Sequence, residues 1–558
     1  MKLPFSTALI ILFTAATTFA QDNRIWATYY GGTGWENFPR VCNDKFGNVY
    51  LGGSSPSLTG IASGGFQNTY GGGPNDGFLV KFDAAGNRIW ATYYGGADDD
   101  YITSVETDTI GNVFVAGYTL STTGIASSGF QNAIGGTYDA FIVKFDANGN
   151  RIWGTYYGGT ASEFFPHVSL DKWGNIYLSG PTQSFNGIAS GGFQNFHNGG
   201  SCDAYLVKFD PNGNRIWGTY YGGTSFDDCR APATIDNAGN IYLTGYSGSL
   251  SGIALNGHQN SMGGSYDAFL VKFNSAGNRM WATYYGDTAY DYGYSSIVDD
   301  SGNIYLSGLT ENSSGIAFNG YQNTIGGMQD AFVVKFDSTG NRIWGTYFGG
   351  AYGEEFSGHN LVKDNTGHFY LGGNTYSSNN IALGGYQNNL ITTENQYLVK
   401  FTMNGIPVCA TYYGQSHEEE CSISVDNYGN VYLAGTSQSA SGIASGGFQN
   451  SLAGSTFDAY LVRFTNCSND DIAELFPPNN FSFYPNPLTQ TSVLEFENPG
   501  HENYTLSIFN SLGKEVQIIK NITINKTVIE RKNLPTGLYF FQLGFGATIS
   551  ASGKFVVE

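Results

Sequence analysis

Seven acidic residues occupy one recurring position in the chain, and carboxylates are side chains that bind hard cations. Each stands six residues after the second aromatic residue of a TYY or TYF triplet; the seven are Glu36, Asp100, Glu163, Asp227, Asp291, Glu354 and Glu419. Further acids lie close to two of them: Asp98, Asp99, Glu418 and Glu420. If these connections meet at one face, they would form a site for Ca²⁺, another cation, or a cationic or polyhydroxylated ligand.

A structural role is the alternative, in which each carboxylate accepts hydrogen bonds from backbone N–H groups of its own or the next repeat. A position shared by all seven repeats favours this role, because a binding site usually breaks the symmetry. The clusters at 98–100 and 418–420 do break it and are the better cation candidates. Ca²⁺ is the only cofactor indicated, and the identity of any metal stays open.

Catalysis has little support in the motifs. The chain contains no GxSxG, HExxH or phosphate-binding glycine loop. Paired carboxylates for glycoside hydrolysis are conceivable on an acidic face, but nothing selects a pair, so no catalytic residue is assigned. Aromatic residues in the same connections could instead stack on sugar rings or pack the rim; they are Trp35, Phe38, Tyr101, Phe164, Phe165, Phe226, Tyr290, Tyr292, Tyr294 and Phe356.

The elements that must position these residues come from a sevenfold repeat of 63 to 65 residues. Each unit contains a version of NRIWATYYGG, then a DxxGN turn signal, a Gly-rich stretch with Gln-Asn, and a version of DAFLVKF. These segments predict four strands per unit, joined by tight turns. The DAFLVKF strand is apolar on both faces, as in a sheet buried on both sides.

The pattern predicts an all-β fold in which residues 21–466 form a seven-bladed β-propeller of four-stranded blades. The first unit begins with its fourth strand and the last ends with its third. The N-terminal strand can therefore complete the last blade and close the ring. The units resemble SBBP repeats, named for bacterial seven-bladed propeller proteins; this resemblance implies the fold and says little about activity.

Residues 1–20 are interpreted as a signal peptide, with Lys2 before a short apolar stretch and a small-residue cleavage site. No segment is long and apolar enough to span a bilayer. The net charge of −20 should repel nucleic acid. Export permits disulfides, and the propeller arrangement suggests the pairs Cys202–Cys229, Cys409–Cys421 and Cys42–Cys467, with free buried thiols as the alternative.

After a linker at 467–480, residues 481–558 predict a small β-sandwich. Its motifs resemble the type A C-terminal sorting domain of the type IX secretion system. The matching positions are Tyr484, Pro485, Asn486, Pro487, Gly513, Lys514, Gly537, Leu538 and Tyr539. The resemblance implies type IX secretion machinery as a partner and places the protein outside a Gram-negative, Bacteroidetes-type bacterium, either released or on its surface.

Three functions follow as hypotheses. The first is a secreted or surface-displayed scaffold for binding or adhesion, with glycans or surface proteins as partners. The second is a secreted polysaccharide hydrolase or lyase that uses the acidic residues. The third is a structural component of a surface layer. The sequence favours the first, because a rigid ring with varied loops suits binding and no catalytic motif is present.

Overall fold

The computed structural model describes residues 24–355, 360–415, 418–454, 457–465, 481–496, 498, 502–510, 514–532, 534–545 and 548–558. The predicted signal peptide and linker lie outside these ranges. The chain divides into two compact units, 1–468 and 469–558. Among the described residues, no helix is long or apolar enough to cross a membrane.

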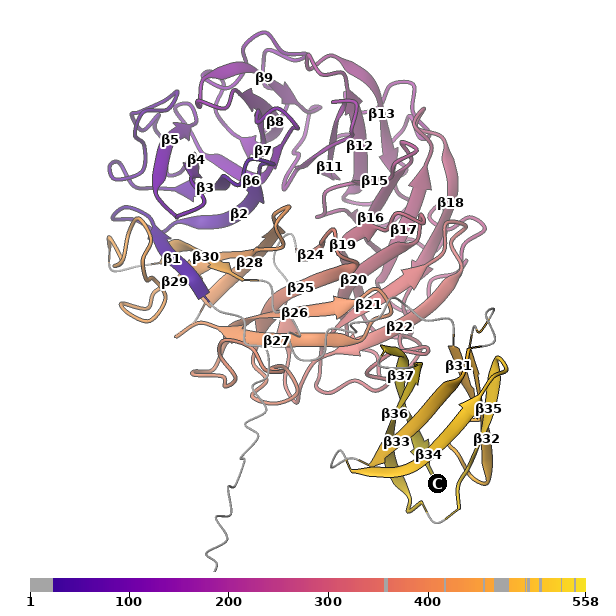
Figure 1. The fold of residues 1–558 in the computed structure, drawn as a ribbon. Helices are drawn as coiled ribbons and strands as arrows, with labels where there is room; N and C mark the ends of the chain where they lie inside the picture. Colours follow the sequence, from indigo (N-terminus) through magenta and orange to yellow (C-terminus); the bar gives the residue numbers. More distant parts are fainter. Residues whose placement is uncertain are drawn as a thin grey trace, which may run out of the picture. The chain divides into compact units, whose positions relative to one another are not determined.

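Seven antiparallel sheets make up the described part of the first unit, and Figure 1 shows them arranged as a ring. We number them blades 1 to 7 in chain order. The first strands of blades 1 to 7 are β2 (Asn37–Asn43), β6 (Asp100–Thr107), β10 (His167–Leu170), β14 (Asp227–Asp228) with β15 (Thr234–Ile235), β19 (Asp291–Val298), β23 (Glu354–Glu355) with β24 (Leu361–Lys363), and β28 (Glu418–Val425).

The second strands are β3 (Val49–Ser55), β7 (Val113–Thr119), β11 (Ile176–Thr182), β16 (Ile241–Ser247), β20 (Ile304–Thr310), β25 (His368–Thr375) and β29 (Val431–Ser437). The third strands are β4 (Asp76–Phe82), β8 (Asp139–Phe145), β12 (Asp203–Phe209), β17 (Asp267–Phe273), β21 (Asp330–Phe336), β26 (Asn395–Thr402) and β30 (Asp458–Phe464). The fourth are β5 (Arg88–Tyr94), β9 (Arg151–Tyr157), β13 (Arg215–Tyr221), β18 (Arg279–Tyr285), β22 (Arg342–Phe348), β27 (Pro407–Tyr413) and β1 (Arg24–Tyr30).

The ring closes through the N-terminal strand, as the sequence predicted. Strand β1 pairs antiparallel with β30, with Thr28 opposite Leu461 and Tyr30 opposite Ala459. The last blade therefore has four strands, in the order β1-β30-β29-β28. Closure leaves the propeller without an orphan sheet whose faces would need capping.

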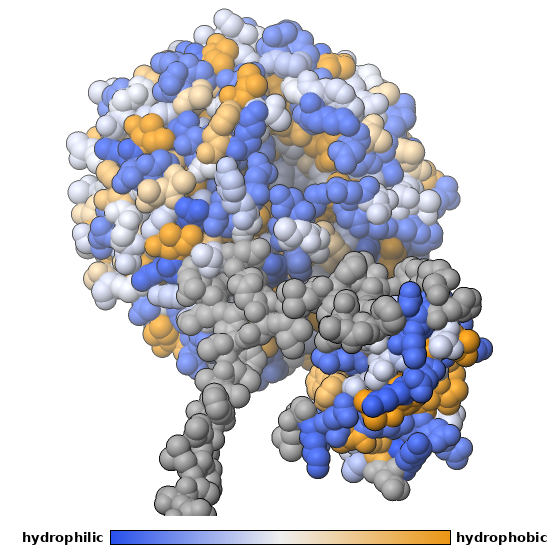
Figure 2. Space-filling model, viewed as in Figure 1, coloured by the Kyte–Doolittle hydropathy of each residue, from blue (hydrophilic) through white to orange (hydrophobic). Residues whose placement is uncertain are grey.

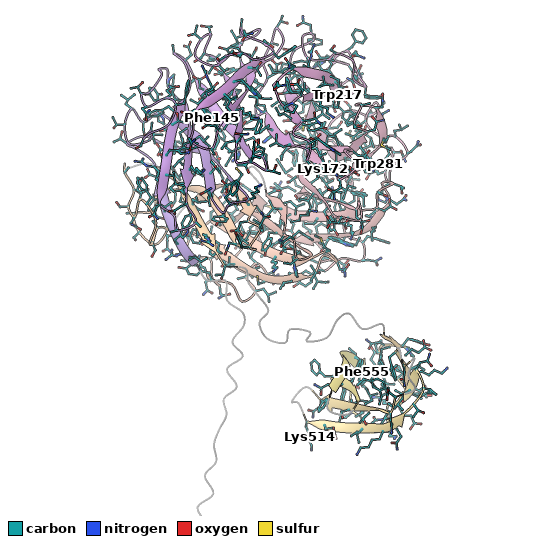
Figure 3. The ribbon with its side chains drawn as sticks, turned by 45° about the horizontal axis from the view of Figure 1, so that its top comes forward. Phe145, Lys172, Trp217, Trp281, Lys514 and Phe555 are labelled. Atoms are coloured by element: carbon teal, nitrogen blue, oxygen red, sulfur yellow. The ribbon has the colours of Figure 1, made fainter. Side chains whose placement is uncertain are left out.

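Packing between blades explains why a Trp and a hairpin glycine recur in the repeat. In six of the seven outer strands a Trp covers the glycine of the next blade's hairpin, whereas β27 has Cys409 at this position. Nε1 of Trp217 donates to Ser275 O at 3.3 Å, and that of Trp281 to Ser338 O at 3.1 Å. A Cβ atom on Gly277 would lie 3.0 Å from the Trp217 ring, and its φ is +80°, so the turn requires glycine. Figure 3 labels both tryptophans.

The DxxGN turns follow the predicted chemistry. In blade 4, Oδ1 of Asp236 accepts the backbone N–H groups of Ala238 and Asn240 at 2.9 and 2.8 Å, and Oδ2 accepts Nδ2 of Asn240 at 2.7 Å. Gly239 has a φ of +84°. An Asp that bonds forward and a Gly with positive φ make the hairpin locally self-sufficient.

The second unit is a β-sandwich of two sheets, ordered β31-β32-β35 and β34-β33-β36-β37. Its strands are β31 (Phe481–Tyr484), β32 (Thr491–Phe496), β33 (Tyr504–Asn510), β34 (Glu515–Ile522), β35 (Lys526–Glu530), β36 (Gly537–Phe545) and β37 (Thr548–Val557). Leu494, Leu506, Phe541 and Phe555 are buried between the sheets. The alternation of apolar residues thus produced the predicted sandwich.

Candidate functional site

The six recurring acids whose side chains are described do not line an open face. Glu36, Asp100, Glu163, Asp227, Asp291 and Glu354 are each 0% exposed, and the side chain of Glu419 lies outside the described residues. Glu36 shows why: its Oε1 accepts the N–H of Gly32 at 3.2 Å and the hydroxyls of Ser55 at 2.6 Å and Ser57 at 2.9 Å. The carboxylate ties the connection between blades to the end of the second strand, which is the structural alternative.

The other five acids repeat this arrangement. Each accepts the N–H of the residue four positions earlier and a side-chain donor at or just after the end of the second strand. The paired distances are 2.7 Å (Gly96) and 2.9 Å (Ser121) for Asp100, 3.1 Å (Gly159) and 2.6 Å (Thr182) for Glu163, 2.7 Å (Gly223) and 2.8 Å (Ser249) for Asp227, 3.0 Å (Asp287) and 2.6 Å (Asn312) for Asp291, and 3.3 Å (Gly350) and 2.9 Å (Thr375) for Glu354.

Among the side chains that the structure describes, the symmetry-breaking acids are not gathered into a cation site. Asp98 is exposed, and Asp99 is half-buried with Oδ1 3.2 Å from Nδ2 of Asn75. Glu420 pairs with Arg40 at 3.3 Å; the side chain of Glu418 lies outside the described residues. Within the described part of the chain, no three His, Cys, Asp or Glu residues form a group that could hold a metal ion.

The candidate site is instead aromatic. Rings from the blade connections, with neighbours from the second and third strands, gather at the end of the sheets where the first strands begin. In blades 1 to 3 the centroids of Phe38 and Phe165 are 5.8 Å apart, and Tyr118 is 4.8 Å from Tyr101 and 5.4 Å from Phe165. Tyr138 and Phe164 extend this group, with their centroids 5.2 Å apart.

A second group lies in blades 4 and 5. Tyr246 contacts Tyr292 at 4.8 Å and Tyr266 at 5.9 Å, and Tyr290 stacks on Tyr292 at 6.1 Å. We call the two groups together the aromatic arc: Phe38, Tyr101, Tyr118, Tyr138, Phe164 and Phe165, and then Phe226, Tyr246, Tyr266, Tyr290, Tyr292 and Tyr294. All except Tyr118 are half-buried or exposed. Figure 2 shows apolar residues scattered among polar ones on the visible face of the propeller.

Arg230 joins the two groups. Its guanidinium lies over the Phe165 ring, 4.8 Å from the centroid, and its Nε donates to Oδ2 of Asp228 at 2.9 Å. The hydroxyl of Tyr246 donates to the same oxygen at 2.8 Å. Asp228 is buried, whereas 44% of the Arg230 side chain is exposed. Asp228 therefore holds the guanidinium in place, and the two terminal nitrogens have no partner among the described residues.

Backbone strain marks the same surface. Phe38 and Phe165 have φ values of +55° and +44°, a region that bulky side chains rarely adopt. Strain of this kind persists only where the surrounding structure enforces it, and it is concentrated at functional sites. Here it accompanies the contact that brings the rings of blades 1 and 3 together.

The sequence anticipated part of this site. It named the connection aromatics as sugar-stacking candidates, but it could not show that Trp35 pairs instead with Phe457, 5.1 Å away; Phe356 lies outside the described residues. It missed Tyr118, Tyr138, Tyr246 and Tyr266, which belong to the strands or adjoin them. It also missed Arg230, which lies between β14 and β15, just after Asp228.

A cavity of about 460 Å³ lies at the other end of the sheets, where the first strands end. Asp300, Lys363, Asp364 and Asn365 are among its lining residues. Lys363 pairs with Asp300 at 3.2 Å, and Nδ2 of Asn365 donates to a backbone carbonyl at 3.1 Å. The Lys363 and Asn365 donors are thus already paired, so neither is a free donor like the terminal nitrogens of Arg230.

The three disulfides predicted from the sequence are wrong. Cys42, Cys202 and Cys229 are free, buried thiols, and Cys421 is buried and forms no disulfide, which excludes all three pairs proposed from the sequence. Cys202 and Cys229 make local contacts, with their sulfurs 3.7 and 3.6 Å from the carbonyls of Asp203 and Ala231. Cys409 is disulfide-bonded, and Cys467 lies outside the described residues.

The sorting-motif positions lie in the sandwich. Oδ1 of Asn486 accepts the N–H of Val556 at 2.9 Å, so the YPNP segment is fastened to the last strand. Tyr539 is buried and its hydroxyl donates to Pro535 O at 2.8 Å. The N–H of Lys514 donates to Oδ1 of Asn510 at 3.0 Å. Gly513 and the side chain of Leu538 lie outside the described residues, whereas Tyr484 is 47% exposed.

Comparison with known families identifies the second unit. Residues 482–558 match the family model described as the secretion system C-terminal sorting domain. The chain is therefore a secreted, cell-surface protein of a Bacteroidetes-type Gram-negative bacterium. This agrees with the predicted export by the type IX route. The SBBP resemblance of the repeats stays a prediction.

Two curated relatives match parts of the chain. An uncharacterized WD repeat-containing protein of Acanthamoeba polyphaga mimivirus is 28% identical over 218 residues, covering 34% of this chain and 15% of the relative. The regulatory protein FlaEY of Caulobacter vibrioides is 24% identical over 311 residues, covering 51% of this chain and 31% of the relative. The matched region thus spans less than a third of either relative.

Solved structures with related shapes include the WD40 domain of Neurospora crassa Pan2, with 10% identity and a TM-score of 0.41, covering 80% of this chain and 96% of that one. A Dyadobacter fermentans protein of unknown function has 9% identity and a TM-score of 0.39, covering 80% and 99%. An ulvan lyase has 10% identity and a TM-score of 0.39, covering 74% and 93%. Likenesses at this level say nothing about activity.

Proposed function

We propose that this protein is a surface-displayed binding module whose ligand is a carbohydrate held on the aromatic arc. The observation that carries the proposal is the gathering of partly exposed rings from five blades around Arg230, at positions that differ from blade to blade. A sevenfold repeat tolerates such differences where loops carry function rather than packing. The rigid, closed ring beneath holds the rings in fixed relative positions.

Aromatic rings suit sugars because their flat apolar faces cover the C–H faces of pyranose rings while hydroxyl groups stay at the edge. The arc supplies both kinds of group. Tyr290 and Tyr292 are stacked with an interplanar angle of 0° and offer hydroxyl groups beside their faces. Tyr290 is the most exposed residue of the arc, at 38%, so contact with a ligand would bury additional apolar surface.

Arg230 adds a preference for acidic sugars. Its fork presents paired N–H donors, the geometry that carboxylate and sulfate groups accept most readily. Asp228 reduces the conformational freedom of the guanidinium, so less entropy is lost when a ligand binds. In a chain with a net charge of −20, one oriented arginine among rings provides a specific anion contact rather than a broad positive field.

The structure weakens the case for an enzyme. The hydrolase or lyase hypothesis depended on carboxylates at an open face, and six of the seven are fully buried and hydrogen-bonded. Binding without turnover therefore has the better support.

The test is a binding titration of the full chain with two oligosaccharides of equal length, one a polyuronate and one neutral. We expect the polyuronate to bind more tightly. Arg230→Gln should weaken its binding about tenfold, as loss of a charge-assisted contact does, and should reduce the preference over the neutral sugar. Tyr292→Ala should weaken both.

Arg215→Gln is the matched control. Arg215 also lies over a phenylalanine, 4.7 Å from the Phe130 centroid, but on an outer strand with its Nη1 near the carbonyl oxygens of Gly187 and Ile188, at 3.3 and 3.4 Å. The Arg215→Gln variant should bind both sugars as tightly as the wild type does. Equal binding by wild type and Arg230→Gln, or no binding of either sugar, would contradict the proposal.

A further inference from the structure

Each recurring acid meets a second buried carboxyl group at the junction between blades. At the junction of blades 7 and 1 this partner is Asp458, the first residue of β30. A Cβ atom on Gly31 would lie 2.3 Å from Oε2 of Glu36 and 2.9 Å from Oδ1 of Asp458, so both oxygens crowd one point. Both residues are 0% exposed, and both oxygens lack a hydrogen-bond partner among the described residues.

Five further junctions have the same construction. In each, the glycine after the fourth strand would place its Cβ within 3.0 Å of an oxygen from either carboxyl group. The carboxyl pairs, which we call the junction pairs, are Glu36 with Asp458, Asp100 with Asp76, Glu163 with Asp139, Asp227 with Asp203, Asp291 with Asp267, and Glu354 with Asp330. All twelve residues are 0% exposed.

We infer that each junction pair is a binding site for one proton, shared between its two carboxyl groups. Two ionised carboxylates this close, both out of water, repel strongly, whereas one proton gives the facing oxygens a hydrogen bond.

The seventh junction supplies a natural comparison. There the chain has Asn395 in place of the aspartate. Oδ1 of Asn395 accepts Nε2 of Gln387 at 3.1 Å and the N–H of Ile391 at 3.0 Å. Asp458 accepts the equivalent groups of Gln449 and Ala453, both at 2.8 Å. An amide is the neutral counterpart of a protonated carboxyl group, so the fold accepts at this junction the uncharged form that we infer at the other six.

A metal ion fits these sites poorly. Each gap is faced by two carboxyl groups, and Ca²⁺ takes six to eight oxygen ligands. Within the described residues no group of three metal-ligating side chains occurs. The donors around the pair, such as the hydroxyls of Ser55 and Ser57, point at Glu36 Oε1 and already satisfy that oxygen.

The pKa values agree with proton binding. Burial, with Asp458 adding to it, raises the pKa of Glu36 to about 7, and burial raises that of Asp458 to about 6. The other titratable side chains near this pair are Tyr30 and Tyr93. Burial raises the pKa of Tyr93 to about 12 and also raises that of Tyr30, so both side chains stay neutral. The positive charge of Arg88 lowers the pKa of Tyr30, but by less than burial raises it.

Protonation of the junction pairs determines how the stability of the propeller depends on pH. A carboxyl group whose pKa is higher in the folded state than in the unfolded chain stabilises the fold while it is protonated. That contribution is complete below about pH 4 and is lost as the pH rises through the folded pKa values of about 6 to 8. The junction pairs therefore make the propeller more stable at pH 5 than at pH 8.5.

The test is thermal unfolding of the full chain between pH 5 and pH 8.5, with CaCl₂ and with EDTA. We expect the wild-type Tm to fall as the pH rises, irrespective of calcium. Asp458→Asn, which copies the seventh junction, should reduce this fall, and Asn395→Asp, which adds a carboxyl group, should increase it. The exposed Asp98→Asn is the matched control and should leave the slope unchanged.

Equal slopes for the wild type, Asp458→Asn and Asn395→Asp would overturn the inference. A Tm raised by calcium and lowered by EDTA, with the difference abolished in Asp458→Asn, would replace the proton by a metal ion and also overturn it. If Asp458→Asn fails to fold, Asn395→Asp and the infrared band of protonated carboxyl groups in the wild type at pH 6 decide; absence of that band contradicts a shared proton.

Discussion

The junction pairs and the aromatic arc lie in the same connections between blades, yet they differ in symmetry. The junction pairs recur at six junctions with nearly the same contacts, are fully buried, and bond to the chain around them. The arc is confined to blades 1 to 5, is partly exposed, and contains one oriented arginine. In this repeat, recurrence marks residues that hold blades together, whereas irregularity marks the surface that we propose binds a ligand.

The largest effect should come from filling a junction. Gly349→Ala would place a Cβ atom 2.3 Å from Oε2 of Glu354, and neither buried carboxyl group can move away without breaking its bonds. We expect a loss of about 3 kcal/mol or more in the free energy of unfolding, measured by chemical denaturation. Gly353→Ala is the control, because its Cβ would meet nothing within 4 Å; equal losses would contradict the assignment.

Removing one donor to a junction pair should have a smaller effect. Thr182→Val deletes the hydroxyl that Glu163 accepts at 2.6 Å and leaves the carboxyl group buried without it, at a cost of about 1–3 kcal/mol. Denaturation curves measure this loss. Thr160→Val, at an exposed hydroxyl, should change stability by less than about 0.5 kcal/mol. A neutral Thr182→Val would show that the contact does not support the fold.

In the aromatic arc, a substitution should affect ligand binding more than stability. Phe165→Leu removes the ring under Arg230 and should weaken binding of an acidic oligosaccharide several-fold, because the guanidinium loses its stacking surface. The Tm should change little, since the ring is half-buried. Comparing titration and melting curves tests both parts. A lower Tm with unchanged affinity would make Phe165 a packing residue.

The repeat predicted the seven blades, their four strands and the closing strand β1, because hydrophobic alternation and turn residues recur seven times and act locally. It identified the position of Glu36 and its counterparts, but not their depth, because burial depends on serine and threonine residues about 20 positions later in the chain. The DAF motif showed Asp458 and its counterparts as strand starts, without showing that each faces an acid from the next blade.

The candidate ligand surface was less predictable for a related reason. Phe38 and Phe165 are 127 positions apart in the numbering, and only the curvature of the ring brings them together. Arg230 was visible as a rare basic residue, but its orientation depends on Asp228 and Tyr246, which meet through strand pairing. The free thiols were unpredictable for the same reason. Cys202 and Cys229 lie in connections that the repeat placed near each other, but the structure leaves both as free, buried thiols instead of a disulfide.

We propose that the recurrent acids stabilise the ring while the irregular arc binds the ligand. The most direct test is to measure polyuronate affinity and the pH dependence of Tm for Arg230→Gln and Asp458→Asn side by side. We expect Arg230→Gln to lose polyuronate affinity and keep the wild-type pH dependence of Tm, and Asp458→Asn to keep the affinity and lose part of that pH dependence. Loss of affinity in Asp458→Asn with unchanged binding in Arg230→Gln would contradict it.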